Sequence, residues 1–179
     1  MTSTSALLFH DYISNAALSR LFALIIGINQ YQWKEDFSSL RGAVPDGKAF
    51  RDYLVKRLRV PEDQIRTLFN EQATRSAIIQ AFKDLSVNHR ITRGDPIFIF
   101  YAGHGSQKPP HRDWNEPNPK IEVIIPHDCT TDKTPVPGNV PPIPDRTIGG
   151  LIDEIAKEKG DNIVGGFNRP LNLVLIQIT

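Results

Sequence analysis

The stretch DPIFIFYAGHG, residues 95–105, decides the fold of this chain. An unbroken apolar run ends at Gly103, and His104 stands between two glycines. Such a run is typical of a strand that is buried on both faces of a parallel sheet. Because ligands bind beyond the carboxyl ends of parallel strands, we expect the His104 ring to project into that crevice.

Strand and helix patterns alternate on both sides of this stretch. The pattern predicts an α/β fold with a mostly parallel sheet flanked by helices. Proline-rich segments at 106–120 and 129–144 predict irregular loops, and residues 1–20 a loose N-terminal arm ahead of one domain over 21–179. The expected strands are 21–29, 63–70, 95–103, 121–128 and 171–178, and the expected helices are 46–58, 74–88 and 145–160, with Thr74 as an N-cap and Gly160 as a C-terminal stop.

The composition bounds the class of protein. With 21 Lys and Arg against 20 Asp and Glu, and no long run of either sign, nothing indicates nucleic acid or a membrane as the partner. The single cysteine, Cys129, excludes an internal disulfide and favours a reducing compartment. The N-terminus lacks the basic region of a signal peptide, and no apolar stretch is long enough to span a bilayer. We therefore expect a cytoplasmic or nuclear protein.

The residues around His104 suit proton transfer during acyl transfer. Histidine titrates near neutrality, so its ring can take and return a proton. The flanking glycines let the main chain approach a substrate, and the Gly105 N–H can point toward a developing oxyanion. The alternative is a loop histidine that makes local hydrogen bonds only. These residues alone leave both interpretations open.

A family resemblance rests on five stretches, namely LIIGIN, LRGAVPDGKAFRDYL, ATRSAIIQAF, YAGHG and IEVIIPHD. Together they resemble the caspase-like cysteine peptidases, peptidase family C14, and are closest to the metacaspase branch found in fungi. The resemblance runs from about Leu21 to Ile163. It implies a caspase-like fold and the cleavage of polypeptides by a cysteine nucleophile.

The resemblance implies roles for three residues. His104 matches the catalytic histidine, and Gly105 supplies the oxyanion-hole N–H. Asp46 matches an acidic residue of the primary specificity pocket, where a buried carboxylate would favour a substrate Arg or Lys. Asp46 also suits the first turn of a helix, and the two roles are compatible. Ala43 and Pro45 depart from the family, which has Cys and Asn or Asp ahead of this aspartate.

The expected nucleophile is missing. In the family it is the cysteine of D-x-C-H-S-G, at the end of a buried strand that follows a segment like DNI (161–163). Here VGGFNRPLNLVLIQIT follows, and no cysteine comes after Cys129. We therefore expect a sheet that is incomplete on its C-terminal side. Cys129 itself is expected to be a loop cysteine with an ordinary pKa and not a substitute nucleophile.

The sequence contains few signs of a metal or cofactor site. The histidines and Cys129 lack zinc-ligand spacing, and we predict no resident cofactor. The resemblance implies calcium as an activating ion, because several metacaspases bind it through acidic loops. The oxygen donors in the corresponding region are spread thinly, and a solvated acidic loop is the alternative; they are Asp113, Glu116, Glu122 and Asp128.

Three hypotheses follow for the chain. It is an incomplete copy of a thiol endopeptidase that cleaves after Arg or Lys, with its tail altered by a retained intron or a frameshift. It is a non-catalytic binding homologue in which LNLVLIQI (171–178) takes the place of the missing strand. Or it does not fold stably, because an exposed strand edge invites aggregation.

Overall fold

A five-stranded sheet forms the body of the molecule. The computed structural model describes residues 19–110, 117, 119–131, 138–169 and 172–178, with only the backbone described from residue 167 on. Four strands run parallel in the order β2 (Ile65–Phe69), β1 (Phe22–Gly27), β3 (Ile97–Ala102) and β7 (Ile163–Arg169). Strand β8 (Asn172–Ile178) pairs antiparallel to β7 at the outer edge.

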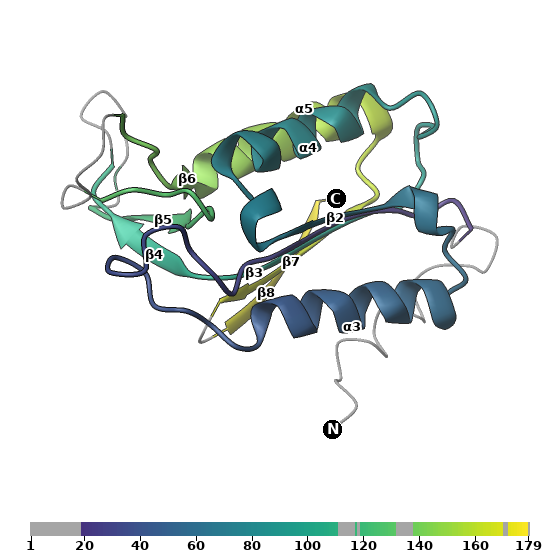
Figure 1. Ribbon diagram of the computed structural model, residues 1–179. Coiled ribbons are helices and arrows are strands. Elements are labelled where there is room, and N and C mark those ends of the chain that lie inside the picture. Colours follow the sequence, from purple (N-terminus) through teal and green to yellow (C-terminus); the bar gives the residue numbers. More distant parts are fainter. Residues whose placement is uncertain (1–18, 111–116, 118, 132–137, 170–171, 179) are drawn as a thin grey trace.

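Helices cover both faces of this sheet. Helices α4 (Arg75–Val87) and α5 (Asp145–Lys159) lie side by side over one face, and α3 (Ala43–Lys56) covers the other (Figure 1). The predicted α/β fold, a mostly parallel sheet flanked by helices, is therefore confirmed.

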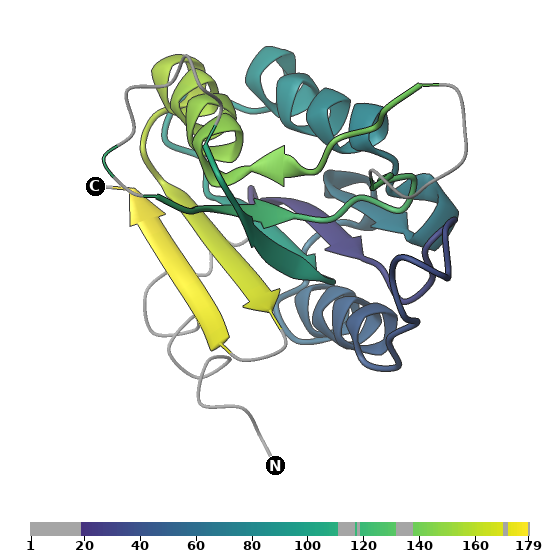
Figure 2. The same ribbon diagram turned by 90° about the vertical axis from the view of Figure 1, so that its left-hand side faces the viewer.

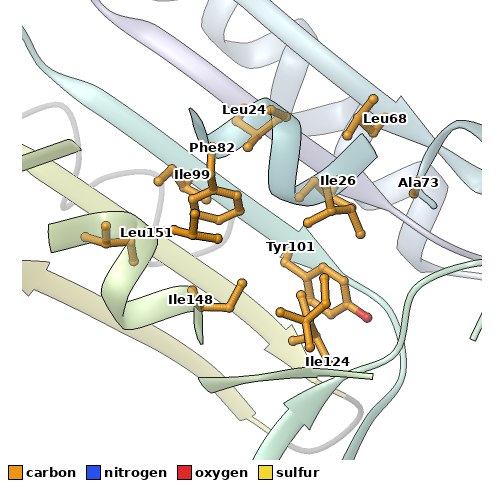
Figure 3. Close-up of a cluster of buried hydrophobic side chains, with 14 of the residues drawn as sticks. Leu24, Ile26, Leu68, Ala73, Phe82, Ile99, Tyr101, Ile124, Ile148 and Leu151 are labelled. Carbon is orange, nitrogen blue, oxygen red and sulfur yellow. The ribbon is translucent and has the colours of Figure 1, made fainter. Parts of the chain in front are cut away.

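The apolar run that predicted β3 packs into two cores at once. Every residue of β1 and of β3 is buried, and successive side chains point to opposite faces. On the α4 and α5 side, Ile99 and Tyr101 meet Phe82 of α4 and residues of α5 (Figure 3). On the α3 side, Phe98 and Phe100 pack with Leu54.

The helix boundaries follow from their caps. Thr74 precedes α4 and its hydroxyl oxygen accepts from the Ala77 N–H at 3.2 Å, which confirms the predicted N-cap. Gly160 follows α5 at φ 91°, which confirms the predicted stop. Helix α3 begins at Ala43 and not at residue 46. Pro45 is tolerated there because N–H groups of the first turn have no partner within the helix.

A small second sheet corrects parts of two expected loops. Strands β4 (Gly105–Lys108), β5 (Ile121–Ile124) and β6 (Ile143–Pro144) form an antiparallel sheet that faces the viewer in Figure 2. The prediction of a loop from residue 106 is wrong as far as Lys108, and the prediction of a loop over 129–144 is wrong at Ile143 and Pro144, which pair with β5. The side chains of β4 are exposed and polar, so this strand is held by main-chain pairing with β5 and leaves no apolar pattern in the sequence. Residues 111–116, 118 and 132–137 lie outside the described residues.

Strand β7 covers the edge of β3 that the hypothesis of an unstable chain leaves exposed. It runs through Gly165 and Gly166, which pair with Ile99 and Phe100 of β3. Strand β3 is therefore bonded on both sides, by β1 and by β7, and its edge is covered. Ladder hydrogen bonds use main-chain groups, so two glycines do not interrupt the strand. Strand β8 lies beyond β7 and does not take its place beside β3.

Of the predicted N-terminal arm only Ser19 and Arg20 are described, so the division at residue 20 stays a prediction. Arg20 Nε donates to Asp95 Oδ1 at 2.6 Å, and this hydrogen bond lowers the pKa of that carboxyl. The contact fastens the start of β1 to the turn before β3. Within the described ranges, no helix has the length and apolar character that a membrane span requires.

Candidate functional site

His104 lies where two neighbouring parallel strands end. Gly27 of β1 is level with Ala102 of β3, and Ile28 N–H donates to Ala102 O at 2.9 Å. The chain after β1, residues 28–42, therefore meets the chain after β3. We call these residues the β1–α3 loop.

The His104 ring is held by the β1–α3 loop in one tautomer. Its Nε2 lies 2.7 Å from the carbonyl oxygen of Ser38. Because a carbonyl oxygen only accepts, Nε2 carries a proton, and the tautomer that fits this contact has its lone pair on Nδ1. Nδ1 is thus the nitrogen that can take a proton from another group. The ring also packs against Tyr31, with centroids 5.0 Å apart.

Two buried tyrosines hold the main chain of His104. The His104 N–H donates to Tyr31 Oη at 2.7 Å, and Tyr101 Oη donates to His104 O at 2.8 Å. The two side chains are 1% and 0% exposed. Burial raises the pKa of Tyr31 to about 12 and that of Tyr101 well above 10, so both hydroxyls stay protonated at neutral pH. A Cβ on Gly103 would lie 2.6 Å from Tyr101 Oη, so this position requires glycine.

Gly105 begins β4 with its main-chain N–H directed away from β5. Ile125 N–H donates to His104 O at 3.0 Å, which makes His104 and Ile125 a hydrogen-bonded pair. Bonded and non-bonded pairs alternate in an antiparallel ladder, so the next pair, Gly105 with Ile124, exchanges no hydrogen bonds. The Gly105 N–H therefore points to the outer edge of β4. This direction is compatible with the oxyanion role, which stays a prediction.

Asp46 lies in the first turn of α3, where its main-chain N–H donates to Gly42 O at 2.8 Å. The helix-terminal position is confirmed. The residue is exposed, and its role in a specificity pocket stays a prediction. Helix α3 starts against the end of β1, since a Cβ on Gly27 would approach Ala43 O to 2.9 Å. Asp46 and His104 thus lie at the same edge of the sheet.

Cys129 is buried, and the prediction of an ordinary pKa is wrong. The residue is 1% exposed and its Sγ lies 3.6 Å from Thr130 O. Burial raises the pKa of its thiol to about 11, because the thiolate would lose its hydration. Few thiolates form at neutral pH, so Cys129 is a poor nucleophile.

The residues next to Cys129 fasten the β1–α3 loop. His127 Nδ1 lies 2.7 Å from Gln30 O, and Gln32 N–H donates to His127 O at 2.9 Å. Tyr31 stands between these two anchored residues. Sequence reasoning missed Tyr31 and Ser38. The first shows only as an aromatic residue after the first strand, and the second acts through a main-chain atom that every residue type has.

The described residues do not assemble a metal site. No three His, Cys, Asp or Glu side chains among them are grouped to hold an ion. Asp128 Oδ1 accepts from the Arg75 N–H at 2.7 Å and so caps the start of α4. Asp113 and Glu116 lie outside the described residues. Calcium binding stays a prediction.

Comparisons with known proteins give a consistent family. The model of the metacaspase, peptidase C14 domain, matches residues 22–139. Metacaspase-6 and Metacaspase-7 of Arabidopsis thaliana are 31% and 30% identical over 156 and 167 residues, 78% and 82% of this chain. Metacaspase-1 of Plasmodium falciparum is 31% identical over 118 residues, 62% of this chain and 18% of that protein. The chain spans 41% and 39% of the two plant proteins, about two fifths of their length.

A solved structure shows the same fold at low identity. The crystal structure of protein GSU0716 from Geobacter sulfurreducens superposes with a TM-score of 0.58 at 20% identity, over 81% of this chain and 47% of that one. That likeness supports the fold alone. The closeness to the fungal branch stays a prediction. The family match covers well over half of the chain and includes the β1–α3 loop, the end of β3 and His104. The chain therefore belongs to the metacaspases of peptidase family C14.

Proposed function

We propose that this chain provides the histidine side of a cysteine endopeptidase site that cleaves polypeptides after Arg or Lys. Peptidase chemistry on a polypeptide follows from the family. One observation supports His104 as the general base: Ser38 O holds Nε2 at 2.7 Å and leaves Nδ1 with its lone pair at the sheet edge. The nucleophilic thiol comes from a cysteine outside this sequence.

The strand register supports a place for that thiol. Ala102 of β3 is level with Asn168 of β7, so the carboxyl end of β7 lies beside the residues that lead into His104. A cysteine presented at this end would be at the same edge as His104. In the relatives that the resemblance describes, the nucleophile follows a strand in this position of the sequence.

The proposed reaction follows from these groups. Nδ1 of His104 takes the thiol proton, and the thiolate attacks the carbonyl carbon of the scissile bond. The oxygen of that carbonyl becomes an oxyanion that accepts from the Gly105 N–H. The imidazolium then gives its proton to the leaving amine, which departs and leaves a thioester. Nδ1 then takes a proton from a water molecule, which attacks the thioester carbonyl. The thiolate leaves and receives that proton from the imidazolium, so the thiol is regenerated.

Asp46 is the proposed selector of the basic residue. Its carboxylate is exposed at the edge that carries His104, where it can accept hydrogen bonds from a guanidinium or an ammonium group. A guanidinium can bond to both carboxylate oxygens, so we expect Arg to be preferred over Lys. The Asp46→Asn variant should lose this preference while keeping its rate on other residues.

The test starts with the transcript across the codons for Asp161 to Thr179. If the frame continues from DNI into a strand ending in D-x-C-H-S-G, that product is expressed and assayed on fluorogenic peptides with Arg at the cleavage site. His104→Ala should lower kcat/KM by roughly 100- to 10,000-fold. His89→Ala, a change at an exposed histidine after α4, is the matched control. Equal rates for the two variants would contradict the proposal.

A second function is favoured by the state of Cys129. The sequence has one cysteine, and its burial and raised pKa make it a poor nucleophile. If the transcript ends as written, the chain is a binding homologue that holds basic peptides without cutting them. Fluorescence anisotropy of an Arg-containing peptide would then show binding that Asp46→Asn weakens. Absence of both binding and cleavage would contradict this function.

A further inference from the structure

We propose that Tyr31 is a positioning residue for His104, and that its hydroxyl, together with that of Tyr101, fixes the His104 peptide and the tautomer of its imidazole. The proposal rests on the proposed function for its catalytic meaning. Its structural part concerns three described residues and can be tested on the chain as it exists.

Two tyrosine hydroxyls hold the main chain of His104. The His104 N–H donates to Tyr31 Oη at 2.7 Å, and the His104 carbonyl accepts from Tyr101 Oη at 2.8 Å. Both main-chain polar groups of His104 are therefore taken up by buried tyrosine hydroxyls.

The two hydroxyls have different roles. A hydroxyl has one proton to donate, and carbonyl oxygens only accept. The Tyr101 proton is shared between the carbonyls of His104, at 2.8 Å, and Ile125, at 3.2 Å. Tyr31 Oη instead accepts from the His104 N–H, so this N–H depends on the Tyr31 hydroxyl for its hydrogen bond.

The same loop also holds the His104 side chain. The β1–α3 loop supplies Tyr31, which contacts the N–H and one face of the imidazole, and Ser38, whose carbonyl takes the Nε2 proton. Anchoring of Gln30 and Gln32 to His127 fixes Tyr31 between them. Loss of the Tyr31 hydroxyl would release the N–H of His104 and loosen the ring against Ser38 O. The imidazole would then populate both neutral tautomers, with the proton on Nδ1 in one and on Nε2 in the other.

The close fit of Gly103 is an independent sign of this arrangement. A Cβ there would lie 2.6 Å from Tyr101 Oη and 3.2 Å from Tyr31 Oη. The residue before His104 thus lies against both tyrosine hydroxyls, and only glycine leaves room for them.

The experiment uses ¹⁵N-labelled chain and three variants. Tyr31→Phe keeps the ring packed on His104 and removes one hydroxyl. Tyr101→Phe removes the second, although Ile125 N–H still donates to the His104 carbonyl. Tyr53→Phe, at a half-buried tyrosine of α3 on the opposite face of the sheet, is the matched control.

Two nuclear magnetic resonance readouts separate positioning from general stability. Long-range ¹H–¹⁵N spectra of the imidazole should show the Nε2–H tautomer in the unaltered chain and in Tyr53→Phe, and a tautomer mixture in Tyr31→Phe. Hydrogen exchange of the His104 amide should rise at least about tenfold in Tyr31→Phe while amides of β1 and β3 keep their rates. Tyr101→Phe should shift both readouts in the same direction but less.

An unchanged tautomer and an unchanged His104 amide in Tyr31→Phe would overturn the proposal. If all amides exchange faster together, Tyr31 is only a stabilising residue and the proposal is also wrong. If Tyr31→Phe does not fold, Tyr101→Phe decides by the same readouts. In a complete, active product Tyr31→Phe should lower kcat and leave KM unchanged. Inactivity of His104→Ala and the spectra of Tyr31→Phe are independent, so either proposal can fail alone.

Discussion

Strands β3 and β7 are neighbours in one register, yet they contribute differently to the molecule. All six residues of β3 are buried, and they fill the cores on both faces. Strand β7 starts with buried Ile163, but at Gly165 and Gly166 it adds no side chain to either core. After β3 comes His104, held by its main chain and its ring. The hydrogen bonds between β3 and β7 are thus complete, although β3 supplies more of the buried side chains and leads into His104.

The largest expected difference between β3 and β7 is in how much their buried side chains stabilise the fold. Ile99→Ala removes a fully buried side chain of β3, and we expect it to lower the free energy of unfolding by about 4 kcal/mol. Val164→Ala, at a partly buried residue of β7, should lower it by only about 1 kcal/mol. Urea unfolding followed by circular dichroism measures both. Equal losses would mean that β7 is as tightly packed as β3.

The end of β3 can be tested at Gly103. Gly103→Ala places a methyl group 2.6 Å from Tyr101 Oη, so the hydroxyls must move, and we expect a loss of about 2–3 kcal/mol. Gly149→Ala in α5, where a Cβ meets nothing within 4 Å, is the control and should stabilise by about 0.5–1 kcal/mol. Differential scanning calorimetry gives both values. If Gly103→Ala is neutral, the end of β3 is less constrained than its contacts indicate.

Cys129 contrasts with His104, because burial keeps its thiol protonated. The pKa of this thiol rises from 9.0 to about 11 in the folded chain, so the unfolded chain loses its proton first. The associated stability is complete below pH 9 and is lost as the pH rises toward 11, by about 2 kcal/mol. Unfolding measured from pH 8 to 11 should show this fall, and Cys129→Ala should reduce it. Fast alkylation at pH 8 would contradict the burial.

The smallest expected effect is at Asp46. Asp46→Asn removes a charge from the first turn of α3 and should lower the free energy of unfolding by about 0.5 kcal/mol, because the helix dipole favours an anion there. Asp46→Glu keeps the charge and is the control. Chemical denaturation at low salt measures the difference. A loss several times larger would mean that Asp46 has a structural role.

Where local pattern and tertiary packing agree, the sequence predicted the fold well. The apolar run of β3, the Thr74 cap and the Gly160 stop each reflect a local rule that the structure keeps. Strand β4 escaped prediction because it is exposed and polar and depends on β5. Strand β7 escaped because glycines are poor strand formers in isolation, while a ladder beside β3 needs only their main chain.

The candidate site was predictable only where a side-chain type carries the signal. A histidine between glycines after a buried strand indicated His104. Ser38 acts through its carbonyl, and the contact of Tyr31 with His104 joins residues 73 positions apart, so neither leaves a local pattern. The burial of Cys129 likewise depends on elements that pack around it from elsewhere in the chain.

The central place of β3 in the strand order also has a consequence for synthesis on the ribosome. One neighbour, β1, precedes it, but the other, β7, begins only after residues 103–162 have been added. At ~5–20 residues per second those 60 residues take on the order of 3–12 s. During that interval one edge of this fully buried strand has no partner. Nascent chains should therefore depend on a chaperone most strongly between the translation of β3 and that of β7.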